Sequence, residues 1–414
     1  WIYIVVFISF ILPQKGSSQS FASKNHYLLD SIPLNDIDSL DKQVIDSCLK
    51  VFHTEKNSID KIDALSGICE QVSNEIWIDY QYYQYELLKT EIQNKDTSEI
   101  SDKLKIILAG TLNNLGLIEE NKGNIEKALI YYNQSMSYSK AAGNFEGHSV
   151  TLGNIGYALE LQGKISQALE YYHRALKLQE KIKDDAGAAK SLNNIGMIYF
   201  DQEDFENALI YYYKSLELNE KSGDKNGMSS SLNNIGLVHR HLNDFPKAID
   251  FYNQSLKIAY EINDKEAVAS CLNNLGVIYQ RLNDAPKALA YYFKSLEIEE
   301  QLNNKLGIIT GLHNIAKTEF ERNNFEKAKK YAKDALKMAQ DFGYPNNILD
   351  PAKVLSQIFK IEGNYKDALN MYELHIQMRD SIKNEETQKA SIRQQTKYEF
   401  EKAQILEEQK KNEE

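Results

Sequence analysis

The sequence predicts an all-α protein, a solenoid of stacked helical hairpins, and three observations lead to this fold class. A 40-residue period runs without gaps from about residue 105 to residue 378. Within each period, apolar residues recur twice at helical spacing, so each period holds two amphipathic helices. The composition agrees, because 42% of the 414 residues are apolar and only six are proline.

A six-residue signature marks each copy of the repeat. It reads TLNNLG at 111–116, TLGNIG at 151–156, SLNNIG at 191–196 and 231–236, CLNNLG at 271–276 and GLHNIA at 311–316. A seventh, weaker copy runs through Ala352 and Ser356, and a degenerate helical hairpin precedes the set at 58–98. We therefore expect an array of seven repeats over residues 99–378.

Each copy is expected to fold as a hairpin of two helices. In the first copy, the core positions are Leu112, Leu115, Gly116 and Glu119, followed by Ala128, Leu129, Tyr132 and Ser135 after a turn at 122–124. Glycine recurs at 116, 156, 196, 236 and 276, and alanine recurs every 40 residues from 128 to 368. These small residues would let the two helices approach closely.

The predicted turns carry residues that end and begin helices. A left-handed helix end is expected at Gly123, Gly163, Asn243, Asn283, Asn323 and Gly363, with Glu203 as the exception. Caps for the second helices are expected at Asn124, Asp204, Asp244, Asp284, Asn324 and Asn364, and Lys164 breaks this rule. Caps for the first helices are expected at Asn144, Asp184, Asp224, Asp264 and Asn304.

This pattern resembles the tetratricopeptide repeat family. The family's order of Leu, Gly, Tyr, Ala, aromatic and Ala is matched by Leu192, Gly196, Tyr199, Ala208, Tyr212 and Ser215. The match covers about two thirds of the chain, with a period of 40 residues instead of the family's usual 34. The resemblance implies a right-handed α-solenoid that binds protein or peptide segments in a concave groove lined by its first helices, without a cofactor.

The strongest candidate for a binding site is a row of asparagines that points away from the hairpin partner. It contains Asn114, Asn154, Asn194, Asn234, Asn274 and Asn314, with Asn193, Asn233 and Asn273 beside it. An amide both donates and accepts hydrogen bonds, so such a row can bind the backbone of an extended peptide. The alternative is that these amides bond neighbouring repeats, and both roles can hold together. Lys190, Arg240 and Arg281 add basic groups to the same face.

Several function classes are disfavoured by the residues. The net charge is −11 and no basic cluster stands out, which argues against nucleic acid as a partner. Cys48, Cys69 and Cys271 show no metal-ligand spacing, although a Cys48–Cys69 bridge is an open alternative. Because no nucleophile, base and orienting acid, phosphate loop or metal cluster is recognisable, we do not expect an enzyme.

The two ends of the chain suggest export and signalling. Residues 1–20 are typical of a secretory signal peptide whose start is missing, with an uncleaved membrane anchor as the alternative. Residues 21–57 are expected to form a leader with a short helix. Residues 379–414 predict a long charged helix, with a solvated capping helix or frayed tail as the alternative.

This arrangement resembles the extracytoplasmic sensor region of bacterial membrane signalling proteins. It implies a periplasmic or periplasm-facing location, membrane attachment through sequence beyond residue 414, and an option for a homodimer through the C-terminal helix. The alternative function is a free periplasmic or surface scaffold for protein complexes.

Overall fold

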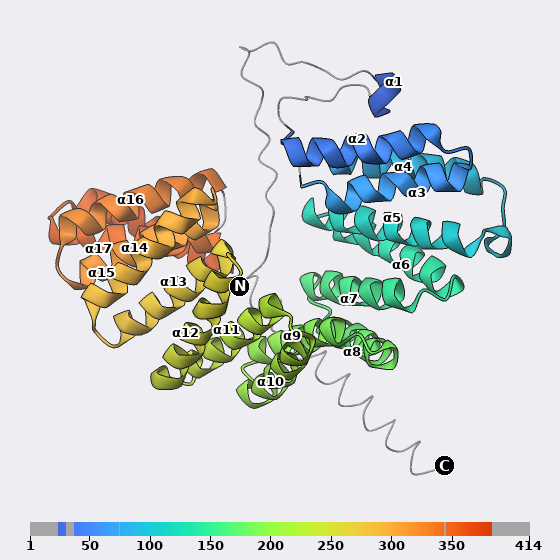
Figure 1. The fold of residues 1–414 in the computed structure, drawn as a ribbon. Helices are drawn as coiled ribbons and strands as arrows, with labels where there is room; N and C mark the ends of the chain where they lie inside the picture. Colours follow the sequence, from blue (N-terminus) through green and yellow to red (C-terminus); the bar gives the residue numbers. More distant parts are fainter. Residues whose placement is uncertain (1–23, 30–36, 74, 343–344, 383–414) are drawn as a thin grey trace. The chain divides into compact units, whose positions relative to one another are not determined.

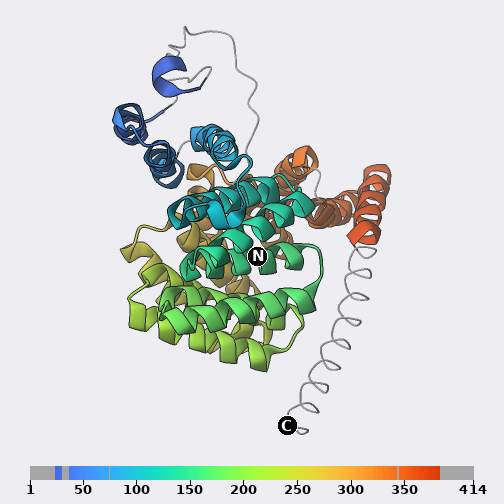
Figure 2. The same ribbon diagram turned by 90° about the vertical axis from the view of Figure 1, so that its right-hand side faces the viewer.

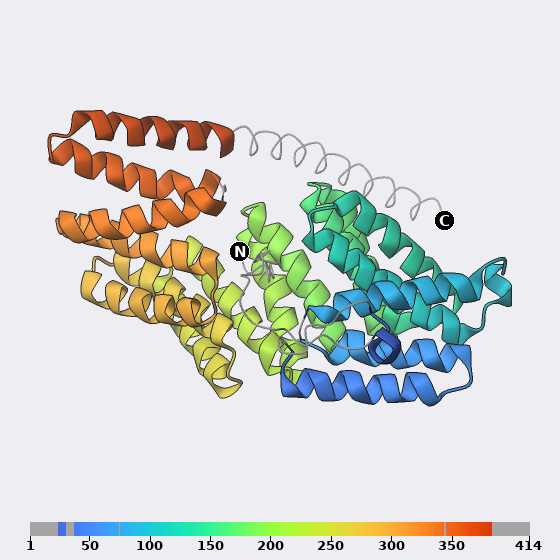
Figure 3. The same cartoon turned by 90° about the horizontal axis from the view of Figure 1, so that it is seen from above.

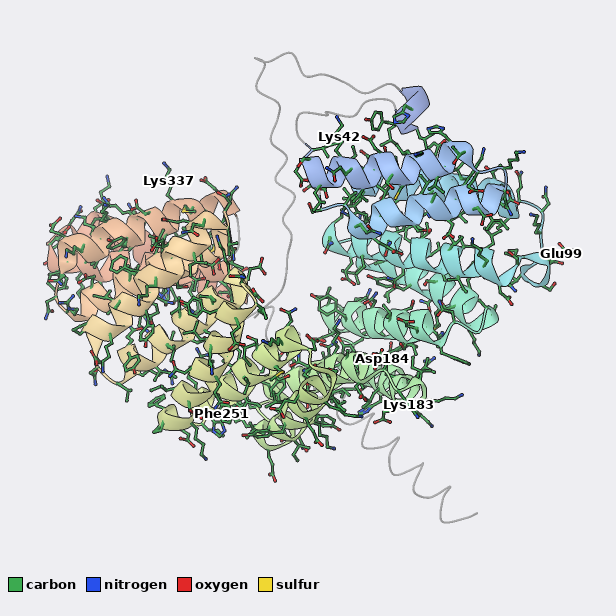
Figure 4. The ribbon with its side chains drawn as sticks, viewed as in Figure 1. Lys42, Glu99, Lys183, Asp184, Phe251 and Lys337 are labelled. Carbon is green, nitrogen blue, oxygen red and sulfur yellow. The ribbon has the colours of Figure 1, made fainter. Side chains whose placement is uncertain are left out.

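The computed structural model describes residues 24–29, 37–73, 75–342 and 345–382, which are helical apart from turns and short connections and contain no strand. The chain divides into two compact units, residues 1–183 and 184–414. The predicted signal peptide at 1–20 and most of the predicted helix at 379–414 lie outside the described residues. Lys183 and Asp184, labelled in Figure 4, mark the boundary between the units.

The first unit holds the leader, the degenerate hairpin and two repeats (Figure 1). Its helices are α1 (Lys24–Tyr27), α2 (Ser39–Thr54), α3 (Ser58–Gln71), α4 (Ile76–Ile92), η2 (Thr97–Glu99), α5 (Asp102–Asn121), α6 (Ile125–Ala141), α7 (Phe145–Leu161) and α8 (Ile165–Ile182). The hairpin predicted at 58–98 is the packed pair α3 and α4.

The leader contains more helix than the short one expected from its sequence. Besides α1 it forms the 16-residue α2, which begins at the N-cap Asp38. Ile45 and Leu49 of α2 are buried against Leu65 and Ile68 of α3, so packing on the hairpin stabilises this helix. Figure 2 views α2, α3 and α4 nearly along their axes as neighbouring cylinders.

The second unit continues the repeat to the end of the described chain. Its helices are α9 (Asp185–Asp201), α10 (Phe205–Ser222), α11 (Lys225–His241), α12 (Phe245–Glu261), α13 (Lys265–Arg281), α14 (Ala285–Gln301), α15 (Lys305–Glu321), α16 (Phe325–Phe342), α17 (Pro345–Ile361) and a last helix over residues 365–382. The predicted seventh copy is α17 with this last helix, which lies beside it at the end of the unit in Figure 3. The Ser356 hydroxyl donates to the carbonyl of Ala368, which ties the two together.

The turns confirm the predicted helix ends. The six expected Gly and Asn residues have φ between 58° and 80°, and Glu203 adopts the same left-handed conformation with φ of 60°. All five caps between repeats accept the expected backbone N–H bond. Asn124 and Asn324 differ from the predicted caps, because their amides donate to the buried carboxylates of Glu119 and Glu319.

The signature glycines make room for tyrosine rings of the second helix. A Cβ added at Gly156, Gly196 or Gly236 would lie 2.8 to 2.9 Å from the ring of the tyrosine 16 residues later. These tyrosines, Tyr132, Tyr172, Tyr212, Tyr252 and Tyr292, are almost fully buried. In the sixth copy both partners change together, since Ala316 replaces the glycine and the buried Ala332 replaces the tyrosine. The signature glycine therefore lets the backbone of the first helix approach the tyrosine ring of the second helix.

Within each unit, the first helices also contact one another. Contacts join α5 with α7 in the first unit, and α9 with α11, α11 with α13, and α13 with α15 in the second. The first helices thus form a continuous layer in each unit, which carries the residues considered next.

Candidate functional site

The predicted binding residues lie on one face of the first helices, which we call the first-helix face. It consists of positions 110, 113, 114, 117, 120 and 121 of the first copy and their equivalents every 40 residues through the sixth copy. Its side chains are half-buried or exposed, except for the buried Asn233, whereas the core positions equivalent to 112, 115 and 116 are buried in the first six copies. The face is therefore accessible along the layer of first helices.

The asparagines form a ladder of hydrogen bonds between successive repeats. In each rung, an amide nitrogen donates to the amide oxygen of an asparagine 41 residues earlier. The rungs are Asn154 to Asn113 (2.8 Å), Asn234 to Asn193 (2.8 Å), Asn274 to Asn233 (3.2 Å) and Asn314 to Asn273 (2.9 Å). Asn114 donates in the same way to the side-chain oxygen of Gln81 on α4. The alternative of bonds between neighbouring repeats is thus realised in the fold.

The ladder leaves hydrogen-bonding capacity unused. An amide side chain has two N–H donors and an oxygen with two lone pairs, and a rung uses one donor of one residue and one acceptor site of the other. Asn194 makes no side-chain hydrogen bond to any other described residue of the second unit, and it is half-buried on α9. A role in binding another chain stays a prediction for these residues.

The three predicted basic residues do not form one group. Lys190 is exposed near the start of the signature on α9. Arg240 and Arg281 lie instead at the C-terminal ends of α11 and α13. Burial lowers the pKa of Arg240, and the charge of Arg281 lowers it further. Arg240 Nη1 donates to the side-chain oxygen of Asn274 at 3.1 Å, and Arg281 Nη1 donates to Asn243 at 3.4 Å.

A histidine and two phenylalanines flank these arginines, and the sequence reasoning did not select them. Arg240 Nη2 lies 3.4 Å from Nε2 of His241. The ring of His241 packs at 5.0 Å from Phe200 and 5.9 Å from Phe205 between centroids. Burial lowers the pKa of His241, and Arg240 and Arg281 lower it further, so the imidazole is neutral at pH 7 and can accept from Arg240. The signal available in the sequence was the position of His241 on the first-helix face, one residue after Arg240.

In three other copies, the residue equivalent to Arg240 accepts a hydrogen bond from the buried tyrosine of the second helix. The buried tyrosine of the second helix donates its hydroxyl to the residue 12 positions earlier, from Tyr132 to Glu120, from Tyr172 to Glu160 and from Tyr292 to Gln280. Burial raises the pKa of Glu120 to about 7, although the Tyr132 hydrogen bond acts in the opposite direction. This row therefore presents hydrogen-bond acceptors in the first, second and fifth copies, phenylalanine in the third and sixth, and a cation in the fourth.

The alternative of a Cys48–Cys69 bridge is not realised, because both residues are free thiols. They pack partly buried in the cluster between α2 and α3. In the described part of the chain, no group of three or more His, Cys, Asp and Glu side chains could hold a metal ion.

The family of the repeat follows from its match to a family model. The model described as "Tetratricopeptide repeat" matches residues 107–181, 187–261 and 264–341, more than half of the chain. The chain belongs to the tetratricopeptide repeat family. Tetratricopeptide arrays are binding modules for other polypeptides, and the first-helix face is the surface that such an array offers.

Several solved structures have a similar fold. The apo form of RapI is 18% identical over 67% of this chain and 99% of its own, with a TM-score of 0.52. The apo form of the quorum sensor NprR from B. thuringiensis is 18% identical over 74% and 83%, with a TM-score of 0.54. A Rap protein complexed with Competence and Sporulation Factor is 14% identical over 84% and 92%, with a TM-score of 0.51. At these identities the similarity is one of fold. No curated protein matches the chain.

None of the helices in residues 24–29, 37–73, 75–342 and 345–382 is both long and apolar enough to cross a bilayer.

Proposed function

We propose that this tetratricopeptide array binds an extended segment of another polypeptide on its first-helix face and performs no catalysis itself. The observation that carries the proposal is the half-buried amide of Asn194, which has no side-chain hydrogen-bond partner among the described residues of the second unit, within a row of amides that keep unused donors and acceptors. Such groups can bond a peptide backbone at regular intervals. In the second unit, the neighbouring positions Met197, Leu237 and Val277 vary in shape and would supply selectivity.

We further propose that binding serves a sensory role outside the cytoplasm. The apolar start of the sequence at 1–20 and the charged segment at 379–414 motivate this proposal. The fold is similar to that of NprR, described as a quorum sensor, and of a Rap protein complexed with Competence and Sporulation Factor, which agrees with a receptor function. A free scaffold that assembles protein complexes is the second candidate.

Binding can be tested with the full chain and a synthetic random heptapeptide library. We expect the chain to retain a subset of peptides, and Asn194→Ala to weaken the binding of a retained peptide about tenfold, as for loss of one or two hydrogen bonds. Fluorescence anisotropy measures the affinity. Asn253→Ala, an exposed asparagine on the second helix α12, serves as the matched control. An absence of retained peptides, or equal affinity of the Asn194 variant, contradicts the proposal.

Cell fractionation separates the two candidate roles. The complete reading frame, expressed with its own ends, is expected in the membrane fraction and to resist extraction at high pH if it is a membrane sensor. Recovery from the soluble periplasmic fraction favours the scaffold, and recovery from the cytoplasm rejects both locations.

A further inference from the structure

The second unit ends in a helix that stands at its outer edge. Each earlier second helix of the unit packs against the first helix of the next repeat, in the pairs α10 and α11, α12 and α13, α14 and α15, and α16 and α17. The last helix, residues 365–382, lies beside α17 and forms the edge of the unit in Figure 3. Residues 383–414 contain no further copy of the repeat signature, so they provide no first helix of the same kind to cover it.

The last helix carries a stripe of exposed apolar side chains, formed by Tyr365, Leu369, Tyr372 and Ile376. These residues follow one another at intervals of four, three and four, so at about 100° per residue they share one side of the helix. Tyr365, Leu369 and Tyr372 are 71%, 56% and 53% exposed, and Ile376 is half-buried. Ala368 lies on another side of the helix and is buried in the core of the unit. The outer side of a terminal repeat is normally polar, and an exposed apolar stripe indicates a contact with another chain.

Equivalent positions are buried inside the array. Leu289 and Leu296 of α14 correspond to Leu369 and Ile376, 80 residues later. Both are only 7% exposed and belong to one apolar cluster with Leu312 of the following first helix, α15. The stripe is therefore built from positions that pack against a neighbouring helix elsewhere in the chain.

Tyr372 is kept outside its own hairpin. In five earlier repeats the equivalent tyrosine packs on the signature glycine, where an added Cβ would lie too close to the ring. The last repeat has Ser356 at the glycine position, and its hydroxyl donates to the carbonyl of Ala368 at 2.9 Å. The space that the ring fills in those repeats is thus occupied, which leaves the ring available to a second chain.

The charges beside the stripe favour a second copy of the same helix as its partner. Lys366 and Glu373 are seven residues apart and lie on the same flank of the stripe, whereas Asn370 and Gln377 on this flank are uncharged. Lys366 and Glu373 form no ion pair with any other described residue of the second unit. In a two-fold contact residue i meets residue j and j meets i, so antiparallel pairing places each Lys366 opposite the Glu373 of the other copy. The stripe is therefore complementary in charge to itself.

We propose that the chain forms a homodimer in which the stripe of the last helix packs antiparallel on the same stripe of a second copy. Leu369 lies near the two-fold axis, and two ion pairs between Lys366 and Glu373 border the contact. The contact involves neither the first-helix face nor the charged residues 383–414, so it is independent of the proposed peptide binding.

The apolar part of the contact can be tested with the full chain by analytical ultracentrifugation. Wild type is expected to dimerise, and Leu369→Glu should raise the dissociation constant of the dimer about hundredfold or more, because a buried leucine is lost from both copies. Leu369 is exposed within its own chain, so the variant should fold, as circular dichroism melting will check. Ile210→Glu, at an exposed isoleucine of α10, is the matched control and should keep the dimer.

The charged part of the contact offers a sharper test. Lys366→Glu and Glu373→Lys each place like charges opposite one another, and each should weaken its own dimer about tenfold. An equimolar mixture of the two variants should form heterodimers, because one presents only carboxylates on this flank and the other only lysines. The double variant regains both ion pairs and should dimerise like wild type.

Three outcomes overturn the proposal. If wild type is monomeric, the stripe is not a homodimer contact, and its protection from hydrogen exchange in that monomer would assign it to residues 383–414. A dimer that survives Leu369→Glu uses another surface. Single charge variants that do not associate when mixed contradict the antiparallel pairing.

Discussion

Gly236 and Tyr252 pack so closely that a methyl group at Gly236 would lie 2.9 Å from the tyrosine ring. Exposed helical glycine normally costs stability relative to alanine. Here the sign is reversed, because the ring of Tyr252 is fully buried and cannot move into solvent.

We therefore expect Gly236→Ala to destabilise the second unit by about 1–3 kcal/mol through overpacking. Thermal unfolding followed by circular dichroism measures the change. Gly153→Ala is the matched control, because a Cβ there meets nothing within 4 Å, and it should be neutral or stabilising. Adding Tyr252→Ala to Gly236→Ala recreates the Ala316 and Ala332 pair of the sixth repeat, so the double variant should lose less than the sum of the single changes. Strict additivity would show that the two residues do not compete for space.

The asparagine ladder predicts different effects for adjacent members of the same row. Asn234→Ala removes the rung to Asn193 and should lower stability by about 0.5–1.5 kcal/mol. Asn194→Ala removes no internal hydrogen bond and should leave the unfolding midpoint in urea unchanged. A similar loss of stability in both variants would mean that Asn194 is also structural.

The missing cap of α8 offers a stabilising substitution. Lys164 has φ −83° and ψ 61° and makes no side-chain cap bond, whereas Asp204 has φ −83° and ψ 74° and accepts from the N–H of Asn207. Because the backbone is already in the conformation of a cap, Lys164→Asp should stabilise the first unit by about 0.5–1 kcal/mol. Lys164→Ala, which removes the lysine without adding an acceptor, should have little effect on the melting temperature. Equal melting temperatures for the Asp and Ala variants would exclude a new cap.

Glu120 predicts a dependence of stability on pH. Burial raises its pKa in the folded chain from 4.5 to about 7, so folding favours the protonated form. Its contribution to stability is complete below pH 4.5 and is lost as the pH rises through 7.

Glu120→Gln keeps an acceptor for Tyr132 and does not ionise, as Gln280 does in the fifth repeat. We expect the variant and wild type to be similar in stability at pH 4, and the variant to be more stable at pH 8 by on the order of 1–3 kcal/mol. Urea unfolding across this pH range measures the difference. Glu126→Gln, at an exposed residue of α6, controls for net charge. A constant difference between Glu120→Gln and wild type at all pH values would contradict the burial of an ionisable group.

The turns and hairpins could be predicted because their causes are local. Asp224 caps α11 by accepting a hydrogen bond from the N–H of Gly227 three residues away, and Asn243 ends α11 in the left-handed region. Both helix ends can therefore be predicted from residue type and spacing. The leader was harder to predict, because α2 is stabilised by the packing of Ile45 and Leu49 on α3. The sequence of α2 alone does not show which helix it packs against.

The candidate site was predicted in part for the same reason. Period and helical spacing place Asn194, Asn234 and Arg240 on one face. They do not reveal that the amide of Asn234 is committed to Asn193 while that of Asn194 is not, because this depends on side chains 41 residues apart. Likewise, whether Arg240 has a counterion among the described residues depends on the side chains that pack around it.

By itself, the sequence determined the repeat, its hairpins, their caps and the face that each asparagine occupies, because a 40-residue period copies local geometry from one repeat to the next. Only the tertiary structure decided which groups on that face are satisfied. Among the described residues, the Tyr252 hydroxyl has no hydrogen-bond partner and Arg240 has no counterion, and both facts depend on which side chains the packed helices bring together.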